Sequence, residues 1–139
     1  MKELSARLFT TADLEYLGLT ENELAVYGKV NFTAPCWTVR YADEVVFCAG
    51  IQRIMAEVGE AWLIFSETGR EYIAAAKTAK KLLLGAIPLF RRIQATADPA
   101  AGRDVRFLEY MGFIYEGTLR GYGPAGQDMR MYSILREDR

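Results

Sequence analysis

The sequence predicts an α/β (α+β) fold, in which a mixed, mostly antiparallel sheet of six to seven strands is flanked by about four helices. One observation is a meander, since three β-rich apolar segments follow one another in the middle of the chain with only short turns between them. Another is the order strand, long helix, strand that comes next, because a right-handed crossover makes such strands parallel. At 139 residues, the chain is most simply one domain that spans residues 1–139.

The N-terminal part predicts one strand, at residues 2–9, and two short helices. Thr10 and Thr20 are helix N-cap residue types, and each has an acidic residue three positions later, which approximates a capping pattern. Gly18 separates the two helices. We therefore expect a strand and two helices ahead of the meander.

The meander is expected at residues 36–41, 45–51 and 60–65. The first segment alternates, whereas residues 45–51 form a continuous apolar run that is typical of a strand buried on both faces. Whether this strand continues through Met55 is left open. Gly59 is expected to lie in the turn before the third strand.

A long helix is expected after the loop at residues 66–69, ending near Gly85 and Pro88. Its apolar positions share one face: Tyr72, Ala75, Ala76, Ala79, Leu82, Leu83 and Ala86. Residues 89–95 predict the strand that completes the crossover.

The segment Arg103–Gly117 joins a helix to a strand through a single glycine. Val105, Leu108 and Met111 recur at intervals of three, as an apolar helix stripe should. Gly112 can adopt the left-handed conformation that ends a helix. Strands are expected to follow at residues 113–119 and 129–135.

Composition excludes several classes of function. The formal net charge is −1, so no overall field favours nucleic acid, and no apolar run reaches the ~20 residues that a membrane-spanning helix needs. The absence of histidine removes the usual metal ligand and the usual general base. No metal site is therefore expected, and any chemistry must use carboxylates, tyrosines, thiols or backbone amides.

The two cysteines, Cys36 and Cys48, are expected to be buried apolar side chains without a disulfide. The first residues lack the apolar core of a signal peptide. We therefore expect a cytoplasmic protein.

The element order and the junction Gly112-Phe113 resemble the GNAT superfamily, the GCN5-related N-acetyltransferases, whose last helix usually ends in Gly-Phe and leads directly into a strand. Residues 122–134 resemble the C-terminal hairpin of that family, and residues 7–14 resemble its first strand and helix start. The chain is more closely similar to the compact GNAT-like proteins of tailed phages, which include the T7-like internal virion protein A group. The resemblance covers nearly the full length by element order.

The resemblance implies an acetyl-CoA site at the end of the third meander strand. The family binds pantetheine beside this strand and the pyrophosphate at the start of the following helix, where unpaired N–H groups favour anions. The residues that match are Ile64, Phe65, Ser66, Thr68, Gly69 and Arg70. The loop is shorter than is usual in the family and lacks its second small residue, and Arg70 could compensate by direct contact with phosphate.

The resemblance also implies a base that deprotonates the amine and an acid that protonates the departing thiolate. Glu60 is the nearest carboxylate on the central strand, although its place after Gly59 favours exposure. The family's usual tyrosine and asparagine correspond here to Leu108 and Ala101. Tyr110 is therefore the candidate acid, and packing is its alternative role.

The resemblance thus implies an acetyl-CoA-dependent N-acyltransferase, encoded by a phage, that acts on an amine of a host protein or small molecule. An alternative is a catalytically inactive GNAT-like module that binds a host or virion protein, in the host cytoplasm or in the virion. A small α/β ligand-binding domain unrelated to this family is a third interpretation. A homodimer is left open.

Overall fold

A computed structural model describes residues 4–8, 35–42, 44–66 and 73–138. Within these residues the chain forms two compact units, Met1–Gln52 with Trp62–Leu82, and Arg53–Ala61 with Leu83–Arg139. The long strands β3 and β4 each pass from one unit to the other. The helices expected between residues 10 and 30 lie outside the described residues.

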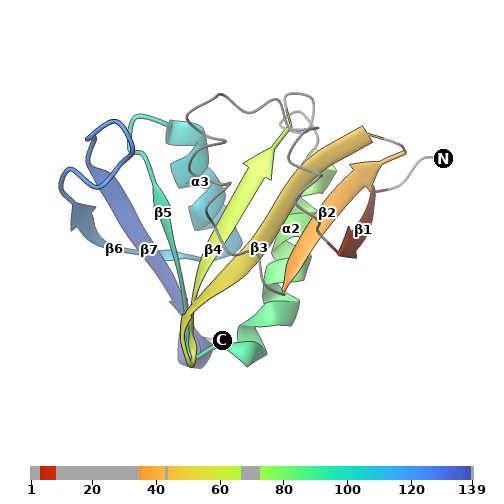
Figure 1. Ribbon diagram of the computed structural model, residues 1–139, viewed down its shortest axis with the longest axis horizontal. Coiled ribbons are helices and arrows are strands. Elements are labelled where there is room, and N and C mark those ends of the chain that lie inside the picture. The colour runs from red at the N-terminus through yellow and green to blue at the C-terminus, as the bar shows by residue number, and fades with distance from the viewer. Residues whose placement is uncertain (1–3, 9–34, 43, 67–72, 139) are drawn as a thin grey trace. The chain divides into compact units, whose positions relative to one another are not determined.

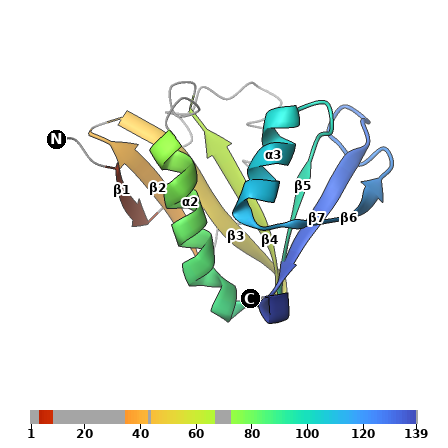
Figure 2. The ribbon, with the colours of Figure 1, turned by 180° about the vertical axis from the view of Figure 1, so that it is seen from behind.

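The first unit contains β-strands and most of a helix (Figure 1). Its elements are β1 (Leu4–Leu8), β2 (Cys36–Tyr41), β3 (Glu44–Met55), the end of β4 (Val58–Phe65) and most of α2 (Ile73–Ala86). Helix α2 crosses behind β2 and β3 in Figure 1 and in front of them in Figure 2.

Burial in the first unit follows the apolar pattern of the sequence. Strand β3 is buried from Val45 through Cys48, as a continuous apolar run predicts. Helix α2 buries Ala75 and Ala79, which belong to its predicted apolar face. Cys36 and Cys48 are both buried, as expected, and they form no disulfide within the described residues.

The second unit is built around a strand–helix–strand element. It contains the start of β4, β5 (Arg92–Ala97), α3 (Gly102–Met111), β6 (Ile114–Leu119), β7 (Met129–Leu135) and the short 3₁₀ helices η3 (Ile87–Leu89) and η4 (Arg136–Asp138). Strand β4 pairs in parallel with β5, which confirms the predicted crossover. Strand β7 pairs antiparallel with β5 on one side and with β6 on the other.

Seven strands follow the hydrogen-bonded order β1-β2-β3-β4-β5-β7-β6. All of the strand pairs that we describe are antiparallel except β4 with β5. The predicted fold class, a mixed and mostly antiparallel sheet with helices, is therefore confirmed. Two α-helices, α2 and α3, lie within the described residues.

Two predicted boundaries were wrong. The strand expected at residue 89 begins at Arg92, because Pro88 lies in a 3₁₀ turn that Phe90 closes with a backbone hydrogen bond to Ile87. Gly59 lies inside β4 rather than in a turn, since β3 continues to Met55 and the two strands are joined at once by Ala56 and Glu57. Strand β4 therefore begins two residues before Glu60, which was expected to be its first residue.

The junction between α3 and β6 has the predicted form. Gly112 has φ +101°, the left-handed conformation, and its N–H donates to the carbonyls of Leu108 and Glu109. The N–H of Phe113 donates to Leu108 as well, at 3.0 Å. The backbone therefore turns directly from helix to strand, and Phe113 is buried.

Candidate functional site

The end of β4 lies in the first unit and contains the described part of the predicted cofactor site. Ile64 is buried, and the ring of Phe65 meets the ring of Phe47 edge-on with centroids 5.7 Å apart. Both the N–H and the hydroxyl of Ser66 donate to the carbonyl of Val46, at 2.9 and 3.1 Å. The two hydrogen bonds hold Ser66 beside β3, directly after the last residue of β4. Thr68, Gly69 and Arg70 lie outside the described residues.

Glu60 lies in the second unit and is half-buried within β4. Glu60 was expected at the head of this strand, where its place after Gly59 favours exposure; because the turn is at residues 56 and 57, it lies two residues inside the strand and is only partly exposed. Burial raises the pKa of the Glu60 carboxyl, and a hydrogen bond from the Gln94 side chain opposes that rise. A carboxylate with a raised pKa is a better proton acceptor near neutral pH than an ordinary glutamate.

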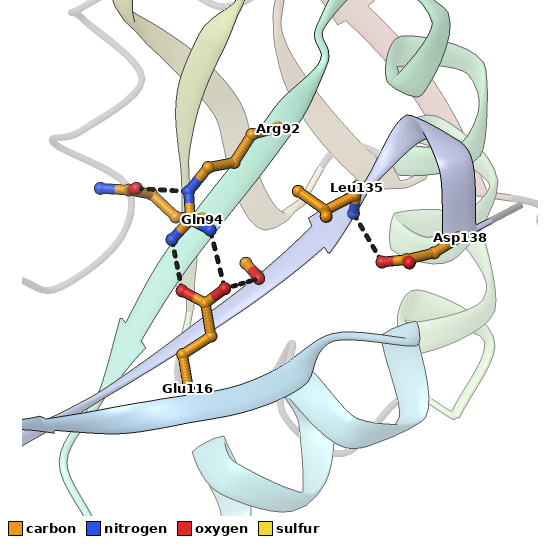
Figure 3. A network of polar contacts seen from close by, with 6 residues as sticks. Arg92, Gln94, Glu116, Leu135 and Asp138 are labelled. Atoms are coloured by element: carbon orange, nitrogen blue, oxygen red, sulfur yellow. Dashed lines mark hydrogen bonds and ion pairs between the residues drawn. The ribbon is translucent and has the colours of Figure 1, made fainter.

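Gln94 belongs to a polar network that sequence reasoning did not find (Figure 3). The Nε of Arg92 donates to Oε1 of Gln94 at 3.0 Å. The two terminal nitrogens of Arg92 donate to the two carboxylate oxygens of Glu116, at 2.8 and 2.6 Å. The hydroxyl of Ser133 donates to Oε2 of Glu116 at 2.6 Å. The bonds from Arg92 and Ser133 lower the pKa of Glu116 to about 2.

A β-bulge in β6 directs the side chain of Glu116 toward this network. Strand β6 pairs Tyr115 with Tyr132 and Gly117 with Met131, so Glu116 is the additional residue between two regular pairs. The ring of Tyr115 packs against that of the buried Tyr132, with the two ring centroids 5.7 Å apart. Since neighbouring side chains in a strand alternate between faces, Glu116 projects to the opposite face, toward Ser133.

Tyr110 lies near the end of α3 in the second unit, and its side chain is 43% exposed. The helix buries Val105 and Met111, so Tyr110 is outside the most buried stripe. Glu60 and Tyr110 are thus both in the second unit, whereas Ile64, Phe65 and Ser66 are in the first.

The network was missed because its members are far apart in the sequence. A weak signal existed in β5, where Arg92, Gln94 and Thr96 alternate with the buried residues Ile93 and Ala95. That alternation predicts a polar face but not its partners. Glu116 lies inside the strand expected at residues 113–119, and a bulge cannot be located from one strand alone.

No family model and no curated protein matches this chain. Several solved structures, in contrast, are similar to this chain. An acetyltransferase of the GNAT family from Bacillus anthracis superposes with a TM-score of 0.75 at 22% identity, covering 99% of this chain and 98% of that one. A protein named as a candidate phosphinothricin N-acetyltransferase superposes with a TM-score of 0.76 at 15% sequence identity, and the match covers 96% of this chain and 98% of that one.

A third similar structure is the spermidine N-acetyltransferase from Vibrio cholerae in complex with CoA and spermine. It gives a TM-score of 0.74 at 15% identity, covering 96% of both chains. At this level of identity the similarity concerns the fold. No helix in the described part of the chain is long and apolar enough to cross a membrane. The chain therefore has the fold of the GNAT acetyltransferases.

Proposed function

We propose that this protein is an acetyl-CoA-dependent N-acyltransferase with an amine as its acceptor. The observation that supports this proposal most directly is Glu60, a half-buried carboxyl with a raised pKa on β4 of a GNAT fold. Similar structures include enzymes named for spermidine acetylation, one of them with CoA and spermine bound. A small amine or polyamine is the first acceptor class to test.

The described residues are compatible with a bound acyl-CoA along β4. The parallel ladder joins Val58–Glu60 to Arg92–Gln94, and β4 continues to Phe65 beyond it. In the GNAT fold, pantetheine pairs with strand amides at this point, as an added strand would. Ile64, Phe65 and Ser66 would hold this arm, and Thr68, Gly69 and Arg70 would hold the pyrophosphate. The cofactor supplies an activated acetyl thioester.

The protein's own residues would move the protons. Glu60 accepts a proton from the acceptor ammonium, which leaves a neutral and nucleophilic amine. Tyr110 donates its phenolic proton to the departing thiolate and regains one from solvent, to which it is exposed. Transfer of the acetyl group would break the C–S bond and form the amide C–N bond, and the attacking nitrogen would lose its second proton to solvent. Glu60 would then release the proton that it accepted, so that each turnover releases one proton overall.

Binding and turnover are tested separately. A ligand at 100 times its Kd adds about 2.7 kcal/mol to the free energy of unfolding, so saturating acetyl-CoA should raise the melting temperature clearly. Arg70→Ala should reduce that shift, whereas Lys81→Ala removes the same charge from an exposed position of α2 and serves as control. Thiol release from acetyl-CoA with spermidine, free lysine and a lysine peptide then reports turnover. Absence of any thermal shift at millimolar acetyl-CoA contradicts the proposal.

A second candidate is a GNAT-like module without catalysis that binds a host or virion protein. The observation that favours it is the replacement of the family's usual tyrosine and asparagine by Leu108 and Ala101. Its signature would be a stoichiometric partner, recovered with the purified chain, that is retained by both Arg70→Glu and Glu60→Gln. Acetyl-CoA turnover that Glu60→Gln abolishes would exclude this candidate.

A further inference from the structure

Three strands of the second unit place polar side chains in one row. Glu60 of β4 is the register partner of Gln94 of β5, and Gln94 is in turn the partner of Ser133 of β7. Paired residues of neighbouring strands project to the same face of a sheet. Glu60, Gln94 and Ser133 therefore lie side by side on one face, and Arg92 and Glu116 are bonded to the same row.

The hydrogen bonds of this row determine how the Gln94 amide is oriented. Arg92 has only donors, so the Gln94 atom that it contacts at 3.0 Å must be the carbonyl oxygen. The amide nitrogen, which carries two donors, is then the atom available to the Glu60 carboxylate. Gln94 lies beside Glu60 in the strand register and lowers the pKa of the Glu60 carboxyl, as donation to the charged form does.

Arg92 is itself held in place. Glu116 accepts from both of its terminal nitrogens, and Ser133 donates to the same carboxylate (Figure 3). A two-point pair of this kind sets the plane of the guanidinium as well as its position. The Nε of Arg92 therefore points along β5 to Gln94 and has little freedom to turn away.

We propose that Gln94 is a positioning residue that holds the Glu60 carboxylate by amide donation, and that the Arg92–Glu116 pair keeps the amide in the required orientation. The catalytic consequence of this contact rests on the function proposed above, whereas the contact itself does not. Gln94 is the register partner of Glu60 on the neighbouring strand and acts on the reaction only through it. Arg53 of β3 has different partners. Its guanidinium lies over the ring of Phe90, 4.6 Å from the ring centroid, and donates a hydrogen bond to the carbonyl of Ala56.

The first test reads the Glu60 carboxyl directly and needs no turnover. Side-chain carboxyl carbons of ¹³C-labelled glutamate are titrated by NMR, and Glu60→Gln assigns the resonance. Gln94→Met keeps the side-chain volume but removes the donor, so the pKa of Glu60 should rise further from its ordinary value. Thr96→Val, a polar-to-apolar change on the same strand and face, is the matched control and should leave that titration unchanged.

A second variant separates orientation from charge. Arg92→Lys keeps the positive charge but cannot make the two-point pair with Glu116 while also donating to Gln94. It should raise the pKa of Glu60 in the same direction as Gln94→Met, by a smaller amount. If the pKa of Glu60 is unchanged in both folded variants, the proposal is overturned. If Gln94→Met does not fold, the titration of Arg92→Lys alone decides between these outcomes.

Kinetics provide the catalytic readout. Gln94→Met should lower kcat by about tenfold, since a misplaced base transfers protons less efficiently, and should leave the KM for acetyl-CoA unchanged. A raised KM with unchanged kcat would contradict a positioning role. If the unmodified protein shows no turnover with any amine, the proposed function fails, and the NMR titration still decides whether Gln94 holds Glu60.

Discussion

Arg92 and Glu116 meet through two parallel hydrogen bonds, Nη1 to Oε2 at 2.8 Å and Nη2 to Oε1 at 2.6 Å, although 24 residues separate them in the sequence. The hydroxyl of Ser133 adds a third bond to the same carboxylate. The Arg92 side chain is 24% exposed and that of Glu116 38% exposed, so solvent screens the pair. The pair thus contributes more to the geometry of the row than to global stability.

The Arg92–Glu116 pair predicts a loss of stability in acid. The pKa of Glu116 is about 2 in the folded protein, below its ordinary value of 4.5, so folding favours the ionised form. The stability from this group is therefore complete above about pH 4.5 and is lost as the pH falls toward 2. Glu116→Gln should lower the free energy of unfolding by up to about 1 kcal/mol at pH 7 and by much less near pH 2.5.

Urea denaturation at pH 7, 4 and 2.5 measures this difference. Glu109→Gln changes the same charge at an exposed position of α3 and serves as control. Equal destabilisation by Glu116→Gln at all three pH values would contradict the prediction.

Glu60 predicts the opposite pH dependence. Its pKa is raised in the folded protein, chiefly by burial, so folding favours the protonated form. Its contribution is therefore most favourable below about pH 4.5 and is lost as the pH rises through the folded-state pKa. Glu60→Gln should raise the melting temperature at pH 7.5, because a neutral amide avoids the cost of burying a charge.

The same substitution should abolish N-acyl transfer, so stability and activity should change in opposite directions. Melting curves at pH 7.5 and 4.5 provide the measurement, and the gain should be smaller at the lower pH. Glu44→Gln, at an exposed position of β3, is the comparison. A lower melting temperature for Glu60→Gln at pH 7.5 would show that burial does not dominate.

Gly112 should not tolerate alanine, because its φ of +101° is a conformation that residues with a Cβ adopt only at a cost. A Cβ there would lie 3.6 Å from Cδ1 of Ile134, an ordinary contact, so the cost is conformational rather than steric. Gly112→Ala should destabilise the protein by about 1–2 kcal/mol. Gly85→Ala, inside α2 with open space around the new Cβ, should instead stabilise it by about 0.5–1 kcal/mol. Urea denaturation of both variants tests the sign of each change.

Gly50 should be intolerant for a steric reason. A Cβ at this position would lie 2.7 Å from Sγ of Cys36, 2.9 Å from the carbonyl oxygen of Pro35 and 3.0 Å from the ring of Trp62. Gly50→Ala should therefore destabilise the protein by about 1–3 kcal/mol, as overpacking does. Gly117→Ala, where a Cβ meets nothing within 4 Å, is the matched control. Equal denaturation midpoints for the two variants would show that the first unit accommodates the methyl group.

Tyr110 should affect turnover rather than folding. Its side chain is 43% exposed, so Tyr110→Phe removes one hydroxyl with little loss of packing. If the phenol protonates the thiolate, kcat should fall by about 100-fold or more, with the KM for acetyl-CoA unchanged. Tyr122→Phe makes the same change at a side chain that is 57% exposed and is the control. An unchanged kcat for Tyr110→Phe would show that solvent protonates the leaving group.

Much of the fold could be predicted from local patterns. The apolar run at Val45–Ile51, the stripe on α3 and the stop at Gly112 all depend on neighbouring residues, and each is found where it was expected. The turn before β4 could not be located, because the same glycine suits a turn and a strand. Two residues, Ala56 and Glu57, suffice for that turn, since β3 and β4 are hydrogen-bonded neighbours in the sheet.

The sequence by itself determined the order of the elements within the described residues, the helix-to-strand junction at Gly112-Phe113 and the carboxylate at Glu60, since each depends on residues close together in the chain. Only the tertiary structure decided how Glu60 is surrounded. Its partner Gln94 lies across a parallel ladder, and the Arg92–Glu116 pair that orients Gln94 depends on a bulge in β6. Strand register places these side chains together, and register is set by the pairing of segments that are distant in sequence.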